Sequence, residues 1–186
     1  YNYQRRTVAD FFRDVARDGF SATISDRWMW AGMRMNPTDI ADVTGATYSY
    51  LLNGRTAEEP WTAQFAPGER VLLRVINAAA GSYFDVRVPG LPMTVVQVSG
   101  QPVEPVETEE FRIAIAETYD VIVQLPDDRA YAVYAEAMDR SGFTAATLAP
   151  RAGVLADLPS RRRRPLLTMA DMGMDHSAMG GMDGMD

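Results

Sequence analysis

The sequence predicts an all-β fold, an antiparallel sandwich or barrel, from three features of residues 50–136. Apolar residues come in short runs rich in β-branched and aromatic side chains, and several runs alternate with polar residues. The runs are residues 71–76, 83–88, 93–98, 111–115, 119–124 and 131–134. Turn signals made of Pro, Gly and Asp separate them. No helix-length periodic segment interrupts the runs, which argues against a βαβ fold.

A short helix is predicted over residues 7–18, before the strands. Thr7 is placed to cap it, Asp10 gives a near capping box three residues later, and Gly19 ends it. One face of this helix is apolar, made of Val8, Phe11, Phe12 and Val15. We expect that face to pack on the β-sandwich.

Further strands are expected outside the central runs. The pattern indicates strands at residues 21–25, 47–52 and 141–148, and a turn at residues 36–39. The pair Asn53-Gly54 is a strong signal for a tight turn directly after the second of these strands. Together these elements place a sandwich over about residues 20–149.

Composition excludes several classes of protein. A net charge of −7 argues against a nucleic-acid partner, and no apolar run is long enough to span a membrane. Cysteine is absent and His176 is the single histidine, which excludes a disulfide scaffold, a Cys nucleophile and a Cys/His zinc site. A Ser-His-Asp triad is excluded unless His176 serves in it. Because the chain begins at Tyr1 without Met, we interpret it as a piece of something longer.

The character of the sequence changes after residue 149. We predict an N-terminal helical segment over residues 1–19, a β domain over 20–160, and an Arg/Pro linker with a Met-rich tail over 161–186. The Arg run at residues 161–164 is interpreted as a solvated linker rather than a lipid or nucleic-acid contact. Charged residues at 136–140 are interpreted as a loop ion pair rather than an acid–base site.

The Met-rich tail is the best chemical signal in the chain. Six of the 11 Met residues lie in residues 169–186, together with four Gly and no periodic apolar face, so we expect the tail to be disordered. Thioether sulfur is a soft ligand that prefers Cu(I), and a flexible chain can wrap several sulfurs around one ion. The predicted copper ligands are Met172, Met174, His176, Met179, Met182 and Met185. The alternative is a linker of incidental composition.

A second pair of thioethers, Met33 and Met35, lies near Trp28 and Trp30. These residues could form another copper site, but Met beside Trp more often means ordinary packing. We therefore interpret them as packing residues, and we assign Met93 and Met138 to the core.

Several stretches resemble the middle cupredoxin domain of multicopper oxidases, namely residues 48–54, 65–79, 84–96 and 116–123. More particular stretches resemble bacterial copper-resistance protein A, and they are residues 3–12, 33–39, 136–142, 147–151 and 165–174. Residues 175–179, Asp-His-Ser-Ala-Met, also resemble a repeat of that family. The resemblance covers nearly the whole chain.

The resemblance implies a cupredoxin-like (plastocyanin-like) Greek-key sandwich from a periplasmic, laccase-like oxidase that uses copper and protects cells from it. Such oxidases hold copper through His-x-His pairs and a His-Cys-His motif, and this sequence contains neither. It therefore implies a non-catalytic middle domain with flanking cupredoxin domains in the same polypeptide, and no catalytic residue here. By itself the chain should be inactive.

Two other functions stay open at this point. One is a stand-alone module that sequesters or delivers copper through its tail without any oxidase partner domains. The other is a generic β-sandwich for protein–protein contact, which the tail argues against.

Overall fold

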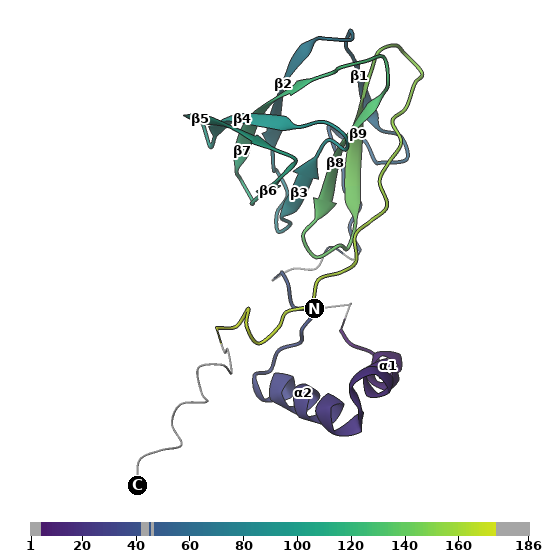
Figure 1. The fold of residues 1–186 in the computed structure, drawn as a ribbon, viewed down its shortest axis with the longest axis vertical. Helices are drawn as coiled ribbons and strands as arrows, with labels where there is room; N and C mark the ends of the chain where they lie inside the picture. Colours follow the sequence, from purple (N-terminus) through teal and green to yellow (C-terminus); the bar gives the residue numbers. More distant parts are fainter. Residues whose placement is uncertain (1–4, 42–44, 46, 174–186) are drawn as a thin grey trace. The chain divides into compact units, whose positions relative to one another are not determined.

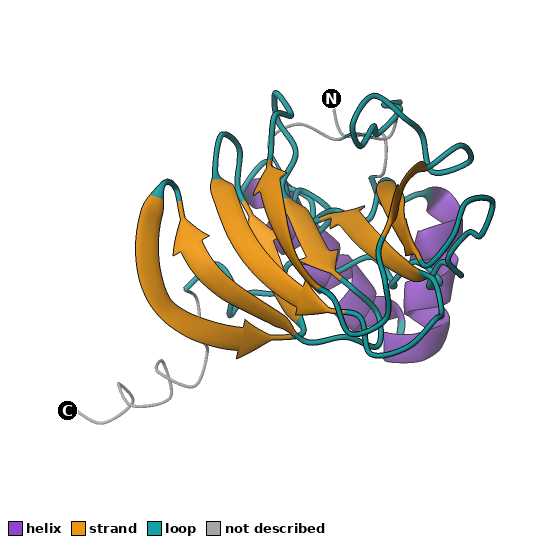
Figure 2. Cartoon of the chain, turned by 90° about the horizontal axis from the view of Figure 1, so that it is seen from above, coloured by secondary structure: helices purple, strands orange, loops and turns teal. Residues whose placement is uncertain are grey.

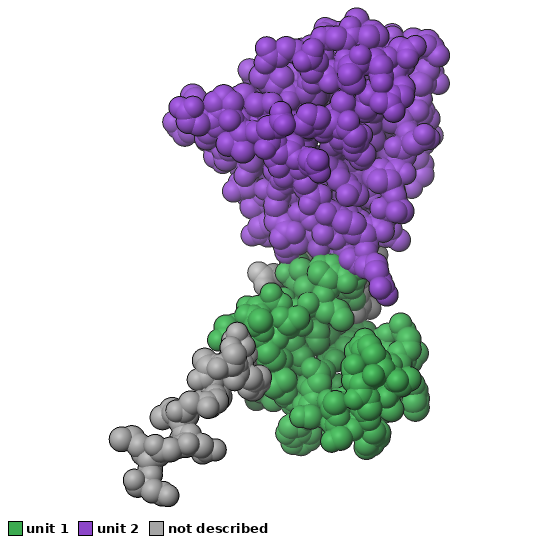
Figure 3. Space-filling view, viewed as in Figure 1, with its two compact units in different colours: residues 1–42, 164–186 green, residues 43–163 purple. Residues whose placement is uncertain are grey.

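The computed structural model describes residues 5–41, 45 and 47–173 (Figure 1). The chain divides into two compact units, coloured separately in Figure 3. The first contains residues 1–42 and 164–186, and the second contains residues 43–163.

The first unit contains two helices, α1 (Val8–Asp18) and α2 (Phe20–Gly32). The capping box is confirmed: the Asp10 backbone N–H donates to Thr7 Oγ1 at 3.2 Å, and the Thr7 N–H donates to Asp10 Oδ2 at 2.6 Å. Gly19 separates the helices with φ +88°, a conformation that suits glycine. The α1 helix is therefore confirmed, whereas its packing on the sandwich stays a prediction.

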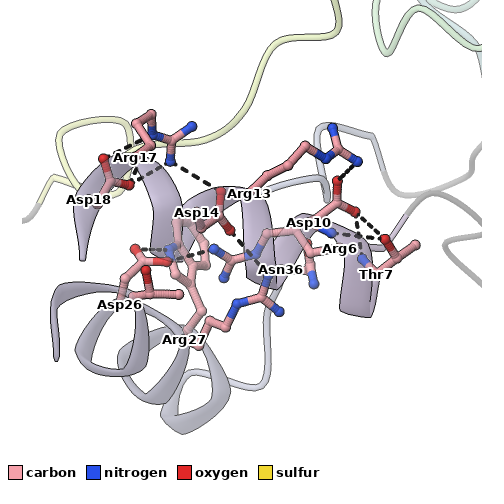
Figure 4. Close-up of polar contacts among 12 residues, drawn as sticks. Arg6, Thr7, Asp10, Arg13, Asp14, Arg17, Asp18, Asp26, Arg27 and Asn36 are labelled. Carbon is pink, nitrogen blue, oxygen red and sulfur yellow. Dashed lines mark hydrogen bonds and ion pairs between the residues drawn. The ribbon is translucent and has the colours of Figure 1, made fainter. Parts of the chain in front are cut away.

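The strand predicted at residues 21–25 is wrong, because these residues lie in α2. β-branched side chains suggested a strand there, but the Thr23 hydroxyl donates to the Gly19 carbonyl at 2.9 Å, a bond available within a helix. Ion pairs also hold the segment to the chain before it, as Figure 4 shows. Arg27 contacts Asp14 of α1 at 3.1 Å, and Arg6 contacts Asp26 at 2.6 Å. Tertiary contacts thus override the local propensity.

Helix α2 ends in a Schellman motif. Arg34 adopts φ +57°, and the Met35 N–H donates to the Trp30 carbonyl at 3.1 Å. The Trp30 side chain is buried, and Met33 and Met35 are half-buried on either side of the turn. This geometry favours the packing interpretation of the two thioethers.

The second unit is a two-sheet β-sandwich, which confirms the predicted fold class (Figures 1 and 2). The five-stranded sheet has the order β1-β9-β8-β3-β6, and the four-stranded sheet has the order β2-β7-β4-β5. The strands are β1 (Trp61–Gln64), β2 (Arg70–Ile76), β3 (Phe84–Arg87), β4 (Met93–Val98), β5 (Gln101–Thr108), β6 (Glu110–Ile113), β7 (Thr118–Gln124), β8 (Tyr131–Ala137) and β9 (Phe143–Ala149). Pairing is antiparallel except between β1 and β9, which run parallel.

The predicted runs match β2, β3, β4, β6, β7, β8 and β9, but three local features differ. Strand β5 was missed because Pro102 and Pro105 resemble a turn, and an edge strand tolerates them. Strand β1 was also missed. The strand predicted at residues 47–52 is wrong, although the turn after it is confirmed: Asn53 and Gly54 have φ +50° and +76°.

The core lies between the two sheets, where side chains of alternate residues meet. Its most buried members include Met93, Ile113, Val121, Val123 and Leu148. Strands β8 and β9 are buried on both faces. Their outer face is approached by the segment after β9, because the Ala156 N–H donates to Thr147 Oγ1 at 3.4 Å. The chain thus returns across its own sheet.

Candidate functional site

The predicted copper-binding tail lies mostly beyond the part of the chain that the structure describes. Met174, His176, Met179, Met182 and Met185 are outside the described residues. Met172 is described, and its side chain is half-buried in a turn. In that turn the Thr168 N–H donates to Asp171 Oδ2 at 2.7 Å, and the Met172 N–H donates to the Met169 carbonyl at 3.2 Å. The proposed ligands are therefore untested by this geometry.

The beginning of the tail is attached to the loop after α2, within the first unit. The Leu167 N–H donates to the Pro37 carbonyl at 2.7 Å, and the Arg164 guanidinium donates to the Thr38 carbonyl at 3.1 Å. Met33 and Met35 precede this loop, while Met169 and Met172 follow the attached segment. Methionines from two distant stretches of sequence therefore belong to one compact unit.

The described residues offer no site for the copper centres of an oxidase. Among them, no three His, Cys, Asp or Glu residues gather in a way that could hold a metal ion. Type 1 and trinuclear copper need several imidazoles and a thiolate, and the whole sequence has one His and no Cys. Copper held by nitrogen and thiolate ligands does not fit this chain, so thioether ligands are what the sequence can offer. Separately, neither described helix combines the length and apolarity needed to cross a bilayer.

The most elaborate polar arrangement in the sandwich was missed by sequence reasoning. We call it the Arg162 cluster, and its members are Asp85, Glu110, Arg112, Glu136, Arg140 and Arg162. Strands β3, β6 and β8 supply four of these residues, the β8–β9 turn supplies Arg140, and the segment after β9 supplies Arg162. Three carboxylates face three guanidinium groups, so the formal charges cancel.

Arg162 occupies the centre of this cluster. Its backbone N–H donates to Glu136 Oε1 at 2.9 Å, and its Nε donates to Glu136 Oε2 at 2.8 Å. Its other nitrogens donate to Glu110 Oε1 at 2.9 Å and Asp85 Oδ2 at 3.3 Å. The solvated-linker interpretation is therefore wrong for Arg162, because its guanidinium finds three carboxylates on the sheet.

The carboxylates of the cluster are buried rather than in an exposed loop. Glu136 has no exposed surface and Asp85 is 2% exposed. Asp85 accepts two hydrogen bonds from Arg112, at 2.8 and 3.2 Å, and one from Arg140 at 2.7 Å. The ion pair predicted at 136–140 is present, with Arg140 Nη1 3.9 Å from Glu136 Oε2, but its placement in a loop is wrong for Glu136, which is buried in β8.

Electrostatics keep these groups ionised. Burial acts to raise the pKa of Asp85, but hydrogen bonds from Arg112 and Arg140 outweigh it, and the pKa is lowered from its ordinary value. Burial acts to lower the pKa of Arg162, but its hydrogen bonds to Glu110 and Glu136 raise it well above its ordinary value. Every acid here has a base as its partner, so the cluster holds structure and offers no free acid or base for catalysis.

Comparisons with known proteins agree with the fold and identify the family. The multicopper oxidase family model matches residues 8–154. The chain is 56% identical to copper resistance protein A of Escherichia coli over 98% of its own length, and 57% identical to copper resistance protein A of Pseudomonas syringae pv. tomato over 99%. It spans 32% and 30% of those two proteins.

Among solved structures, the chain resembles Fet3p, a multicopper oxidase that functions in iron import. The TM-score is 0.50 at 20% identity, and the likeness covers 63% of this chain and 25% of that one. Identity this low supports the sandwich fold alone. The family match and the two bacterial relatives carry the assignment: this chain is a cupredoxin domain that belongs to the multicopper oxidases, in their copper-resistance group.

Proposed function

We propose that this chain is the non-catalytic middle cupredoxin domain of a periplasmic copper-resistance oxidase, and that its Met-rich tail binds copper. One observation carries the proposal. The chain is more than half identical to copper resistance protein A over nearly its whole length, yet it has one His and no Cys. The ligands of an oxidase centre must then come from the rest of the polypeptide.

The role of the sandwich in this proposal is to hold the chain on either side of it. It has a buried core and a neutralised Arg162 cluster, and among the described residues no three His, Cys, Asp or Glu gather as a metal site, which supports this role. Arg162 ties the segment after β9 to the sheet, so the chain stays attached to the sandwich up to this residue rather than leaving it at the end of β9. A domain of this kind spaces and orients its neighbours.

The role of the tail is to bind Cu(I) by its thioethers, with His176 as an additional imidazole. Thioether sulfur carries no proton to lose, so it stays a ligand in acid. A Gly-rich chain has few apolar groups to bury, so metal binding must itself offset the cost of ordering it. Moderate affinity, suited to passing copper on, follows from that cost.

A Cu(I) competition titration against a chromogenic chelator tests the tail. The test variant replaces Met172, Met174, Met179, Met182 and Met185 with Leu, which keeps apolar bulk and removes sulfur. The control variant replaces Met29, which lies in α2, and Met33 and Met35, which follow that helix, with Leu. A third protein ends after Pro165. We expect the control to withdraw as much copper as the wild type, and the other two to withdraw much less.

The outcomes separate the parts of the proposal. If all four proteins withdraw the same amount of copper, the tail is a linker and its copper-binding role is wrong. If the control loses as much copper as the test variant, the site lies around α2 instead. The copper-treated wild-type chain should not oxidise a laccase-type phenol, and turnover by it would contradict the non-catalytic role.

A further inference from the structure

The sandwich unit has an apolar hollow of about 890 Å³ on one side. Five large apolar side chains that line it are exposed, and Ile76 and Leu51 are the most open at 66% and 56%. The other three are Tyr48, Trp61 and Leu72. Behind them lie core residues from both sheets, including Val71, Val86 and Leu148. The hollow therefore leads from solvent to the core.

The backbone around the hollow has free hydrogen-bonding edges. Strand β2 ends the four-stranded sheet and pairs with β7 alone, and β1 ends the five-stranded sheet and pairs with β9 alone, as far as the described residues show. Within the same described part, residues 49–51 make no backbone hydrogen bond. Free strand edges beside apolar surface are the usual template for adding an extended segment.

A buried polar atom points to the same conclusion. Thr144 lines the hollow and is 4% exposed, yet its hydroxyl has no hydrogen-bond partner within the described structure. Buried hydroxyl groups in native proteins are almost always paired. An occupant of the hollow with a polar backbone atom could supply the missing partner.

The occupant follows from the length of the relatives. This chain spans 30–32% of the two copper resistance proteins, so more than two thirds of such a polypeptide lies outside it. We propose that an extended, amphipathic segment of that outside polypeptide lies with its apolar side in the hollow and pairs with the free edge of β2. The proposal rests on the proposed function, because it requires this chain to be one domain of a longer protein.

The chemistry of β2 specifies the kind of segment. Val71, Leu73 and Val75 face the core, while the other side of the strand alternates Arg70 and Arg74 with Leu72 and Ile76. A partner strand beside it should be apolar toward the hollow and should carry polar or acidic residues outward. An amphipathic extended segment satisfies both requirements, whereas a polar linker does not.

Two matched variants of the full-length parent protein test this proposal. Ile76→Asp changes β2 at the hollow, and Val106→Asp changes β5 at the opposite end of the same sheet, where Val106 is also 56% exposed. In the parent protein we expect Ile76→Asp to lower the melting temperature by about 5 °C or more and Val106→Asp to leave it within about 1 °C. Equal small shifts would overturn the proposal.

Further measurements identify other occupants. Concentration-dependent dimers of this chain that Ile76→Asp abolishes, together with equal shifts in the parent, would assign the hollow to a second copy and overturn the proposal. If an apolar dye binds the wild-type parent protein but does not bind the Ile76→Asp variant, the hollow is a small-molecule site, and this result would also overturn the proposal. If the parent protein shows oxidase activity but both variants have the same melting temperature, the proposed function stands and this inference fails.

Discussion

The two sides of the sandwich differ in whether the chain itself covers them. On the outer face of β3, β6 and β8, the chain returns after β9 and covers buried carboxylates with Arg162. At β2, apolar side chains and strand edges stay uncovered around the hollow. A buried charge must be paired within the domain itself, because an unpaired buried carboxylate costs several kcal/mol of stability. Exposed apolar side chains cost far less, so that side can be completed by another part of a longer protein.

The comparison also separates stability from assembly. The Arg162 cluster joins residues that are 26, 52 and 77 positions apart in sequence, so it ties the end of the domain to its middle. The exposed side chains at the hollow contribute little to such ties between distant segments. Mutations at the cluster should therefore lower the stability of the isolated chain, whereas mutations at the hollow should lower stability only in the parent protein.

The largest effect is expected from Arg162→Ala. This change removes the guanidinium that pairs with buried Glu136 at 2.8 Å, which leaves only the more distant Arg140 at 3.9 Å, and it frees the segment after β9. Because the Arg162 side chain is itself one-third exposed, we discount the cost of a broken buried pair to about 2–4 kcal/mol of unfolding free energy. Urea unfolding of the chain measures it. Arg161→Ala is the control and should change stability by less than about 0.5 kcal/mol, since Arg161 is exposed. Equal effects would mean that the cluster does not anchor the segment.

A smaller, pH-dependent effect is expected from Asp85→Asn. The pKa of Asp85 is lowered in the folded state, so its ionised form stabilises the fold above the unfolded-state pKa of about 3.9. That stability is lost as the pH falls through the folded-state pKa. The variant should be less stable than the wild type at pH 7, and the difference should shrink below about pH 4. Urea midpoints at a series of pH values measure this. A difference that stays constant from neutral to strongly acid pH would contradict the assigned role.

The smallest effect is expected from Leu72→Gln in the isolated chain. Leu72 is 47% exposed at the hollow, so its replacement removes little buried apolar surface from the isolated chain. We expect the unfolding free energy of this chain to change by less than about 0.5 kcal/mol. A loss of 2 kcal/mol or more by urea unfolding would show that the chain covers this side by itself, and the contrast between the two sides would disappear.

Sequence reasoning predicted the sandwich because its signal is local. Alternating runs such as those of β4 and β7 show which residues face the core, and Thr7 with Asp10 shows where α1 begins. Helix α2 was missed because its support comes from ion pairs with α1 and Arg6, which no local pattern contains. Strand β5 was missed because its prolines are tolerated only at an edge.

The candidate sites were predictable to different degrees. The Met-rich tail is visible because soft ligands at high density form a local compositional signal. The place of Arg162 in its cluster was not predictable, since a run of four Arg gives no sign that one of them reaches Glu136 across the sheet. The acidic members did give a signal: Asp85, Glu110 and Glu136 all fall within predicted or adjoining strands, where an unpaired charge would be costly.

Hydrogen exchange measured on this chain and on the full-length parent tests the central contrast most directly. Amides of β3 and β8, beneath the Arg162 cluster, should exchange slowly in both proteins. The β2 amides that point away from β7 should exchange quickly in this chain and at least about tenfold more slowly in the parent, because the partner segment pairs with them. If β2 exchanges at the same rate in both proteins, the sandwich has no partner at the hollow and the account is wrong.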